Sequence, residues 1–179
     1  MTPWFWSFIL YSFLGFLLEV GYAWATGGRC ERKCLLVLPL CPVYGLGACA
    51  ILWLPLWVQE RPWALFILGG LTATATEYLV AVFYQRVLGV SFWDYQGLPG
   101  SLQGRVCLPF SLAWGTLALV LVYGVHPLLA PWLSAVPVPV SWIAAVTLAA
   151  DLLISATLLR RTRDLASLQW YVSWRKRPG

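Results

Sequence analysis

Three acidic side chains interrupt otherwise apolar stretches of the sequence: Glu19, Glu77 and Asp151. Each is followed nine or ten residues later by an arginine: Arg29, Arg86 and Arg160. On a helix that rises about 1.5 Å per residue, each carboxyl group would lie roughly 14 Å from its basic neighbour. A carboxylate in apolar surroundings is costly unless it faces protein or water, so these acids are candidates for binding a cation or a proton.

The composition indicates what surrounds the acids. Of 179 residues, 60% are hydrophobic and only 11% are charged, and the mean hydropathy is +0.75. Soluble domains average roughly 25% charged residues, and a chain of this size cannot bury so much apolar surface in water. The composition excludes a water-soluble enzyme or a nucleic-acid-binding module and makes the lipid bilayer the expected partner.

Five apolar runs are long enough for membrane helices, which need about 20 residues. They cover residues 4–25, 35–58, 63–84, 106–125 and 140–159. The sequence therefore predicts an all-α integral membrane bundle of five transmembrane helices over residues 1–160, followed by a basic, aromatic cytoplasmic tail at 161–179. Between the last two runs, residues 126–139 contain four prolines, and we expect an interfacial or re-entrant segment there.

The basic residues predict the orientation. With five spans, eleven of the twelve Lys and Arg residues fall on one side and only Arg61 falls on the other. Cytoplasmic loops carry the excess of basic residues. We therefore expect the amino terminus outside and the carboxyl terminus in the cytoplasm.

The sequence repeats itself weakly. Residues 13–20 align with 71–78, which sets Glu19 opposite Glu77, and residues 38–45 resemble 108–115. Residues 148–153, which include Asp151, look like the start of a third copy. Every copy begins on the outside, so the repeats are parallel, as they are in some transporters.

Small and hydroxylated residues share helical faces with the acids. Tyr22 lies near Glu19 at helical spacing, Thr74 near Glu77, and Ser155 near Asp151. We expect these six residues to line a midplane site for a cation, a proton or a cationic substrate group. The alternative is that the acids, in protonated form, hold the helices together.

The cytoplasmic loop 89–105 is the other unusual stretch. It contains Trp93, Asp94 and Tyr95, then three glycines around Pro99, and it ends at Arg105. We predict that these four residues form a gating loop in which Asp94 and Arg105 pair. A turn-rich connector with an interfacial aromatic anchor is the alternative.

The cysteines and the single histidine give no sign of a metal site. Cys30 and Cys34 fall in the first predicted cytoplasmic loop, where reducing conditions disfavour disulfides, and His126 is distant from them. We expect unpaired thiols, no catalytic residues, no metal and no other cofactor.

Several motifs carry a resemblance to a known family. They are Gly15 with Glu19, LPLCPVYG at 38–45, Glu77, WDY at 93–95, GRVCL at 104–108 and WG at 114–115. Together they resemble the CmpB family, the ABC-transporter type IV permeases of bacteria.

The resemblance implies a permease-like transport protein of the bacterial inner membrane, working as a homo-oligomer or within a hetero-complex. No GxxxxGK[ST] motif occurs in the chain, so ATP hydrolysis would belong to a separate ATPase subunit. Two other functions stay open: a structural or assembly protein, and an intramembrane enzyme acting on a lipid with Arg105 holding its phosphate. The sequence has no Ser/His pair of evident spacing, which disfavours the enzyme.

Overall fold

The computed structural model describes residues 2–27 and 34–168, and within these ranges it contains helices and no strand. The all-α class is confirmed. The helices are α1 (Thr2–Ala25), α2 (Pro42–Leu52), α3 (Leu56–Gln59), α4 (Pro62–Ala64), α5 (Gly70–Phe83), α6 (Leu108–Leu119), α7 (His126–Ser134) and α8 (Val138–Thr162). The cytoplasmic tail expected at residues 161–179 lies mostly outside the described residues.

Four helical segments are long and apolar enough to cross a membrane: Pro3–Ala25, Pro62–Leu88, Leu108–Ser134 and Val138–Thr162. Two of these segments contain wider π-helical turns. Leu65–Gly69 joins α4 to α5, Tyr84–Leu88 ends the segment after α5, and Val120–Val125 joins α6 to α7. Many large apolar side chains on their outer faces are exposed, including Leu79 and Ile143. Such a surface is stable in lipid and not in water, which supports a membrane protein.

The helix expected over residues 35–58 is much shorter in the structure, because only α2 (Pro42–Leu52) forms there. Prolines explain both limits. Pro42 lies in the first helical turn, where its missing N–H costs no hydrogen bond, and Pro55 lies between the end of α2 and the short helix α3. Residues 34–41 form a non-helical segment in which Cys34, Leu36 and Cys41 are buried.

The proline-rich segment 126–139 is also different from the expected interfacial or re-entrant turn. Residues His126–Ser134 form α7, which continues α6 as one helix. Pro139 occupies the first turn of α8, a position that tolerates proline, whereas Pro127 and Pro131 lie inside the continuous helix Leu108–Ser134. The helix that begins at Leu108 therefore extends nine residues beyond the predicted end at 125.

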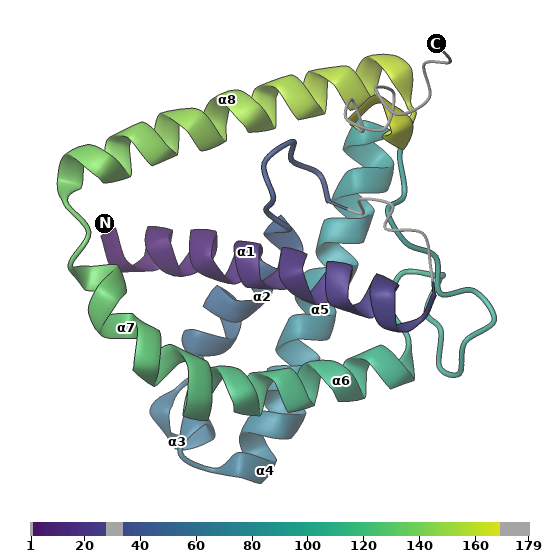
Figure 1. The fold of residues 1–179 in the computed structure, drawn as a ribbon. Helices are drawn as coiled ribbons and strands as arrows, with labels where there is room; N and C mark the ends of the chain where they lie inside the picture. The colour runs from purple at the N-terminus through teal and green to yellow at the C-terminus, as the bar shows by residue number, and fades with distance from the viewer. Residues whose placement is uncertain (1, 28–33, 169–179) are drawn as a thin grey trace.

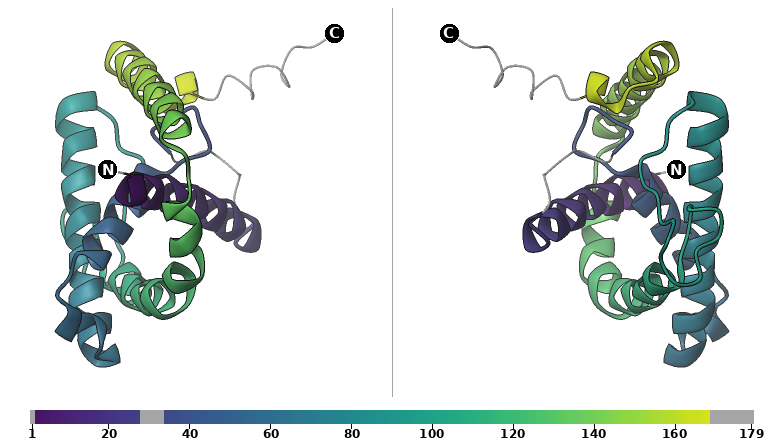
Figure 2. Two further views of the ribbon diagram at one scale, coloured as in Figure 1. Left: turned by 90° about the vertical axis from the view of Figure 1, so that its left-hand side faces the viewer. Right: turned by 90° about the vertical axis from the view of Figure 1, so that its right-hand side faces the viewer.

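The most extensive contacts between helices are those of α1 with α2 and of α5 with α6, and α2 also packs against α5. In Figure 1, α1 lies between α8 and α6, while α5 crosses behind it. Figure 2 shows α2 to α5 along one side of the molecule. One buried cluster gathers around Leu36, Tyr84 and Leu159 and another around Ile51 and Leu65, and Glu77 belongs to the helix that contributes to both.

Candidate functional site

Glu19 and Glu77, which come from α1 and α5, line one cavity of about 280 Å³. We call this cavity the acidic pocket. Glu77 is buried, with 4% of its surface exposed, whereas Glu19 is partly exposed. Tyr22, one turn after Glu19, lines the same pocket. The structure therefore brings together three of the six side chains that the sequence indicated.

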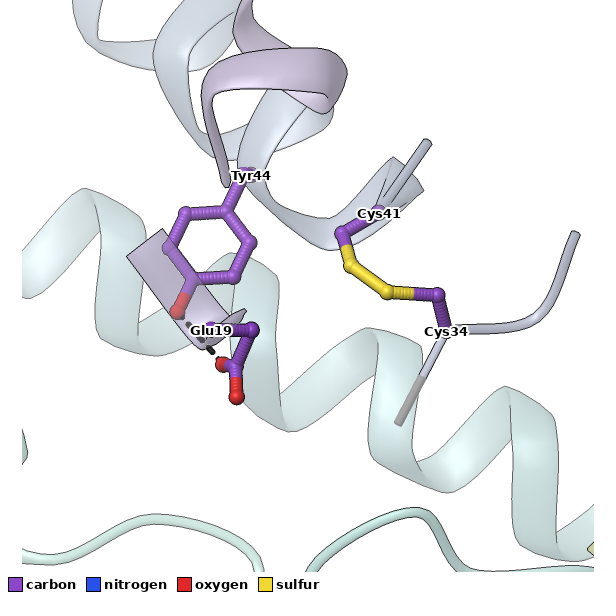
Figure 3. The surroundings of a disulfide bond; sticks show 4 residues. All are labelled: Glu19, Cys34, Cys41 and Tyr44. Carbon is purple, nitrogen blue, oxygen red and sulfur yellow. Dashed lines mark hydrogen bonds between the residues drawn. A yellow bond between two sulfur atoms is a disulfide. The ribbon is translucent and has the colours of Figure 1, made fainter. Parts of the chain in front are cut away.

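Glu19 accepts a hydrogen bond of 2.6 Å from the hydroxyl of Tyr44, which reaches it from α2 (Figure 3). The ring of Tyr44 lies directly against the backbone of Gly15, where a Cβ atom would overlap it. Gly15 is thus the residue that permits α1 and α2 to approach closely enough for this bond. The first acid of the pocket depends on a glycine one helical turn away.

Glu77 accepts two hydrogen bonds, one at each carboxyl oxygen. The hydroxyl of Tyr95 donates to Oε1 at 2.9 Å, and the indole Nε1 of Trp114 donates to Oε2 at 2.9 Å. Burial, and then the neighbouring Glu77 carboxyl, raise the pKa of Tyr95, so its phenol stays protonated and able to donate. Hydrogen bonds to a carboxylate are stronger than those between neutral groups, and these two fix the position of Glu77.

Aromatic rings form most of the remaining wall of the acidic pocket. The lining includes Tyr22, Tyr44, Trp93, Tyr95, Phe110 and Trp114. Tyr95 stacks on Phe110 with ring centroids 4.7 Å apart, and Tyr44 meets Trp114 at 5.1 Å. The faces of such rings attract cations, most strongly where water is excluded. Two carboxylates among aromatic faces suit a positively charged organic group.

The two helix pairs make matching contacts. Tyr44 of α2 donates to the acid of α1, and Trp114 of α6 donates to the acid of α5. The residue after each donor is a glycine that packs on a phenylalanine backbone, Gly45 on Phe8 and Gly115 on Phe66. Phe8 and Phe66 are separated by 58 residues, as are Glu19 and Glu77.

Asp151 has other partners and does not line the acidic pocket. Its two carboxyl oxygens accept hydrogen bonds from the backbone N–H groups of Val37 and Leu38, at 2.9 and 2.8 Å. Ser155, which is fully buried, donates to Asp151 at 3.0 Å. Asp151 therefore satisfies two backbone N–H groups of the non-helical segment 34–41, and Ser155 bonds to Asp151. Among the described residues, the buried Thr74 hydroxyl has no hydrogen-bond partner.

The loop expected to gate the site contributes two aromatic side chains to the acidic pocket, Trp93 and Tyr95. The indole of Trp93 also donates to the carbonyl of Arg105 at 2.8 Å, which closes the loop on itself. Because Glu77 accepts a hydrogen bond from the Tyr95 hydroxyl, the loop contacts α5 at the pocket.

Asp94 and Arg105 have separate partners in this loop. Asp94 accepts a hydrogen bond from the backbone N–H of Gln96 at 2.9 Å. Arg105 donates to Gln85 at 2.8 Å, to Tyr78 at 3.0 Å and to Gln103. The pairing of Asp94 with Arg105 that we expected is replaced by these bonds, because each group is satisfied within its own turn or by α5.

A disulfide joins Cys34 to Cys41, with 5.0 Å between their Cα atoms (Figure 3). The expectation of unpaired thiols is wrong for this pair, because the bent segment 34–41 brings together two cysteines that the sequence separates by seven residues. Cys49 and Cys107 are free, and Cys30 lies outside the described residues. Within ranges 2–27 and 34–168, no group of three or more His, Cys, Asp or Glu side chains could hold a metal ion.

Sequence reasoning missed Tyr44, Trp114 and Phe110 as residues of the pocket. A signal for two of them was present, since the alignment of 38–45 with 108–115 sets Tyr44 opposite Trp114. Both side chains combine an apolar ring with one hydrogen-bond donor. Each of them follows one of the two aligned acids along the chain, and this matching position was the available indication that they donate hydrogen bonds to the acids.

The fold and the pocket define a class: a helical membrane protein with a carboxylate pair enclosed by aromatic rings. The sequence model of the family described as "Putative ABC-transporter type IV" matches residues 6–158. The chain belongs to this family, and the resemblance to it is confirmed. Comparisons with curated proteins and with solved structures found no match.

Proposed function

We propose that this chain is the membrane-embedded, permease-like subunit of a transporter, and that Glu19 and Glu77 bind a proton, a cation or the cationic group of a substrate. The observation that carries the proposal is that carboxylates from two different helices line one small cavity. Family membership supports a transporter component. Any ATP hydrolysis takes place on a separate subunit of the complex.

The hydrogen bonds of the pocket support a binding role for the acids. An acid in the middle of a membrane costs at least about 2.5 kcal/mol on insertion scales. Tyr44, Tyr95 and Trp114 offset that cost with neutral donors. Neutral donors stabilise a carboxylate without cancelling its charge, so the pocket keeps its attraction for a cation.

We propose five membrane crossings, with the second made by the bent segment 34–41 followed by α2. Non-helical backbone is tolerated at membrane depth only where protein satisfies its polar groups. Asp151 binds the N–H groups of Val37 and Leu38, and the N–H of Cys41 donates to the carbonyl of Ser12 at 2.9 Å. With five crossings, the amino terminus lies outside the bacterial inner membrane and the carboxyl terminus lies in the cytoplasm.

The matching contacts of α1–α2 and α5–α6 support the proposal that these pairs are parallel repeats. In that arrangement each repeat contributes one acid and one aromatic donor to a shared site, as repeats do in some transporters. The ring contact between Tyr44 and Trp114 joins the two halves of the site.

One observation favours the alternative of a structural or assembly protein. Both carboxyl oxygens of Glu77 have partners from the same chain, as they would in an acid that only holds helices together. Glu19 differs, because the one bond in Figure 3 occupies only its Oε1 atom.

The test is uptake of radiolabelled tetramethylammonium by proteoliposomes that contain the purified chain, with and without a pH gradient. We expect Glu19→Gln and Glu77→Gln to abolish uptake while both variants remain folded, as a cooperative thermal unfolding transition would show. Glu60→Gln is the matched control, because Glu60 is exposed after the short helix α3. Wild-type uptake by both pocket variants would contradict the proposal.

A further inference from the structure

A second and larger cavity, of about 670 Å³, adjoins the acidic pocket. It lies between α1, α2 and the helix formed by α6 and its π-helical extension, and its lining comes from residues 11–25, 44–51 and 114–125. We call it the apolar groove, because aliphatic and aromatic side chains make up almost all of its lining. Its volume is within the roughly 300–1,000 Å³ typical of sites for single small ligands.

The groove and the acidic pocket share walls. Tyr44 and Trp114 line both cavities, as do Leu18, Tyr22 and Leu117. Tyr44 and Trp114 are also the donors to Glu19 and Glu77. The two carboxyl groups therefore lie across the shared wall from an otherwise apolar cavity.

Glycines keep the groove open. A Cβ atom built on Gly47 or Gly21 would meet nothing within 4 Å, although Gly47 is itself buried. Gly15 and Gly45 differ, since a Cβ atom at either would overlap a neighbouring side chain. The space beside Gly47 is thus unfilled by this chain's own packing.

We propose that the pocket takes an amphiphilic organic cation, with its ammonium head between Glu19 and Glu77 and its apolar tail in the groove. This inference rests on the proposed function and names its substrate class. Charge complementarity selects the occupant: the acidic pocket that adjoins the groove has two carboxyl groups and several aromatic faces, which attract an ammonium group and repel the phosphate of an anionic phospholipid. Exposed groove residues such as Leu17 and Val120 open it toward lipid, so the substrate enters sideways from the membrane.

The experiment measures binding of two radiolabelled probes, tetramethylammonium and dodecyltrimethylammonium, to the full chain in nanodiscs of phosphatidylglycerol. Affinities for dodecyltrimethylammonium are calculated from the concentration of probe that has partitioned into the membrane. The amount of probe bound by nanodiscs without protein is subtracted. We expect Gly47→Leu to weaken dodecyltrimethylammonium binding at least tenfold and to change tetramethylammonium binding less than twofold. Glu19→Gln weakens binding of both probes.

A second groove variant guards against misfolding of the first. Val120→Trp fills the groove from the opposite wall at an exposed position, and Val146→Trp, exposed on α8 away from the groove, is the matched control. Equal effects of both groove variants on the two probes, or no effect on either, would overturn the tail site while leaving the acidic pocket intact. Probe binding that is insensitive to Glu19→Gln and Glu77→Gln would instead overturn the proposed function.

Two other occupants are separate outcomes. Loss of probe binding when phosphatidylethanolamine is added to the nanodiscs would assign the groove to a membrane lipid. A wild-type dimer that Gly47→Leu converts to a monomer, measured by light scattering, would assign it to a second copy of the chain. Either result overturns the inference, as does absence of binding of both probes to the wild type.

Discussion

Replacing Asp151 with alanine tests whether this acid holds the backbone or binds a substrate. In the structure Asp151 is 8% exposed, and its carboxyl group accepts hydrogen bonds from the N–H groups of Val37 and Leu38 at 2.9 and 2.8 Å. Segment 34–41 has no helix to satisfy these N–H groups. Asp151→Ala leaves both of them without their acceptor.

The expected loss follows from the two bonds. A hydrogen bond to a charged group contributes about 1.5–3 kcal/mol to stability, so the free energy of unfolding should fall by about 3–6 kcal/mol. Asp151→Asn keeps one carbonyl acceptor and should lose about half of that. Ser155→Ala is the matched control, because it removes only the donor to Asp151 and leaves both backbone bonds in place.

Two measurements follow the loss: unfolding in mixed micelles titrated with dodecyl sulfate, and hydrogen exchange at Val37 and Leu38. Since 1.4 kcal/mol corresponds to a factor of ten, exchange at these amides should accelerate by about a hundredfold or more in Asp151→Ala. Wild-type unfolding and wild-type exchange in this variant would refute the reasoning. Loss of cation binding in a variant of unchanged stability would return Asp151 to the substrate site.

Three further predictions concern the pocket and its supports. Tyr95→Phe removes one donor to Glu77 and should lower the free energy of unfolding by about 1.5–3 kcal/mol. Burial raises the pKa of the Tyr95 phenol, so absorbance spectra of wild type and variant should show the same number of tyrosines titrating near the ordinary value of about 10. One fewer such tyrosine in the variant would contradict the burial of Tyr95. Gly15→Ala places a methyl group against the ring of Tyr44 and should destabilise the protein by about 1–3 kcal/mol in thermal unfolding. The methyl group of Gly47→Ala meets open space, so this variant should be as stable as wild type or more stable. A Gly47→Ala variant less stable than Gly15→Ala would be inconsistent with the packing. Alkylation of the denatured, unreduced protein should label Cys49 and Cys107 and spare Cys34 and Cys41; mass spectra with all four labelled would show that the disulfide is absent.

Much of the architecture was predictable because lipid imposes a simple rule. Every backbone polar group must be satisfied within the protein, so long apolar runs become helices. The runs at 4–25, 63–84 and 140–159 each coincide with a membrane-length helix. Prolines caused both errors in predicted helix length. Pro42 begins α2, whereas Pro127 lies inside the continuous helix Leu108–Ser134, so a proline in the sequence does not by itself mark where a membrane helix ends.

The partnership of the acids was only partly accessible. Alignment of residues 13–20 with 71–78 set Glu19 opposite Glu77, and both line one cavity in the structure. Asp151 has the same spacing from a basic residue and a different environment, because the neighbour of its helix is the bent segment 34–41 and not another acid. Spacing along a helix reports depth and face, but it carries no information about which helix lies opposite.

The sequence by itself indicated a helical membrane protein of the ABC-transporter type IV family, with acids inside its long apolar runs. These properties depend on composition, local hydrogen bonding and motifs. Only the tertiary structure showed that Tyr44 and Trp114 donate hydrogen bonds to the acids and that Asp151 accepts hydrogen bonds from backbone N–H groups. It also showed the disulfide between Cys34 and Cys41 and the open groove beside Gly47. Each of these features depends on segments that are distant in the sequence or on a segment that bends back on itself. Such contacts form only when the packed helices fix the positions of these segments relative to one another, and no local sequence pattern encodes those positions.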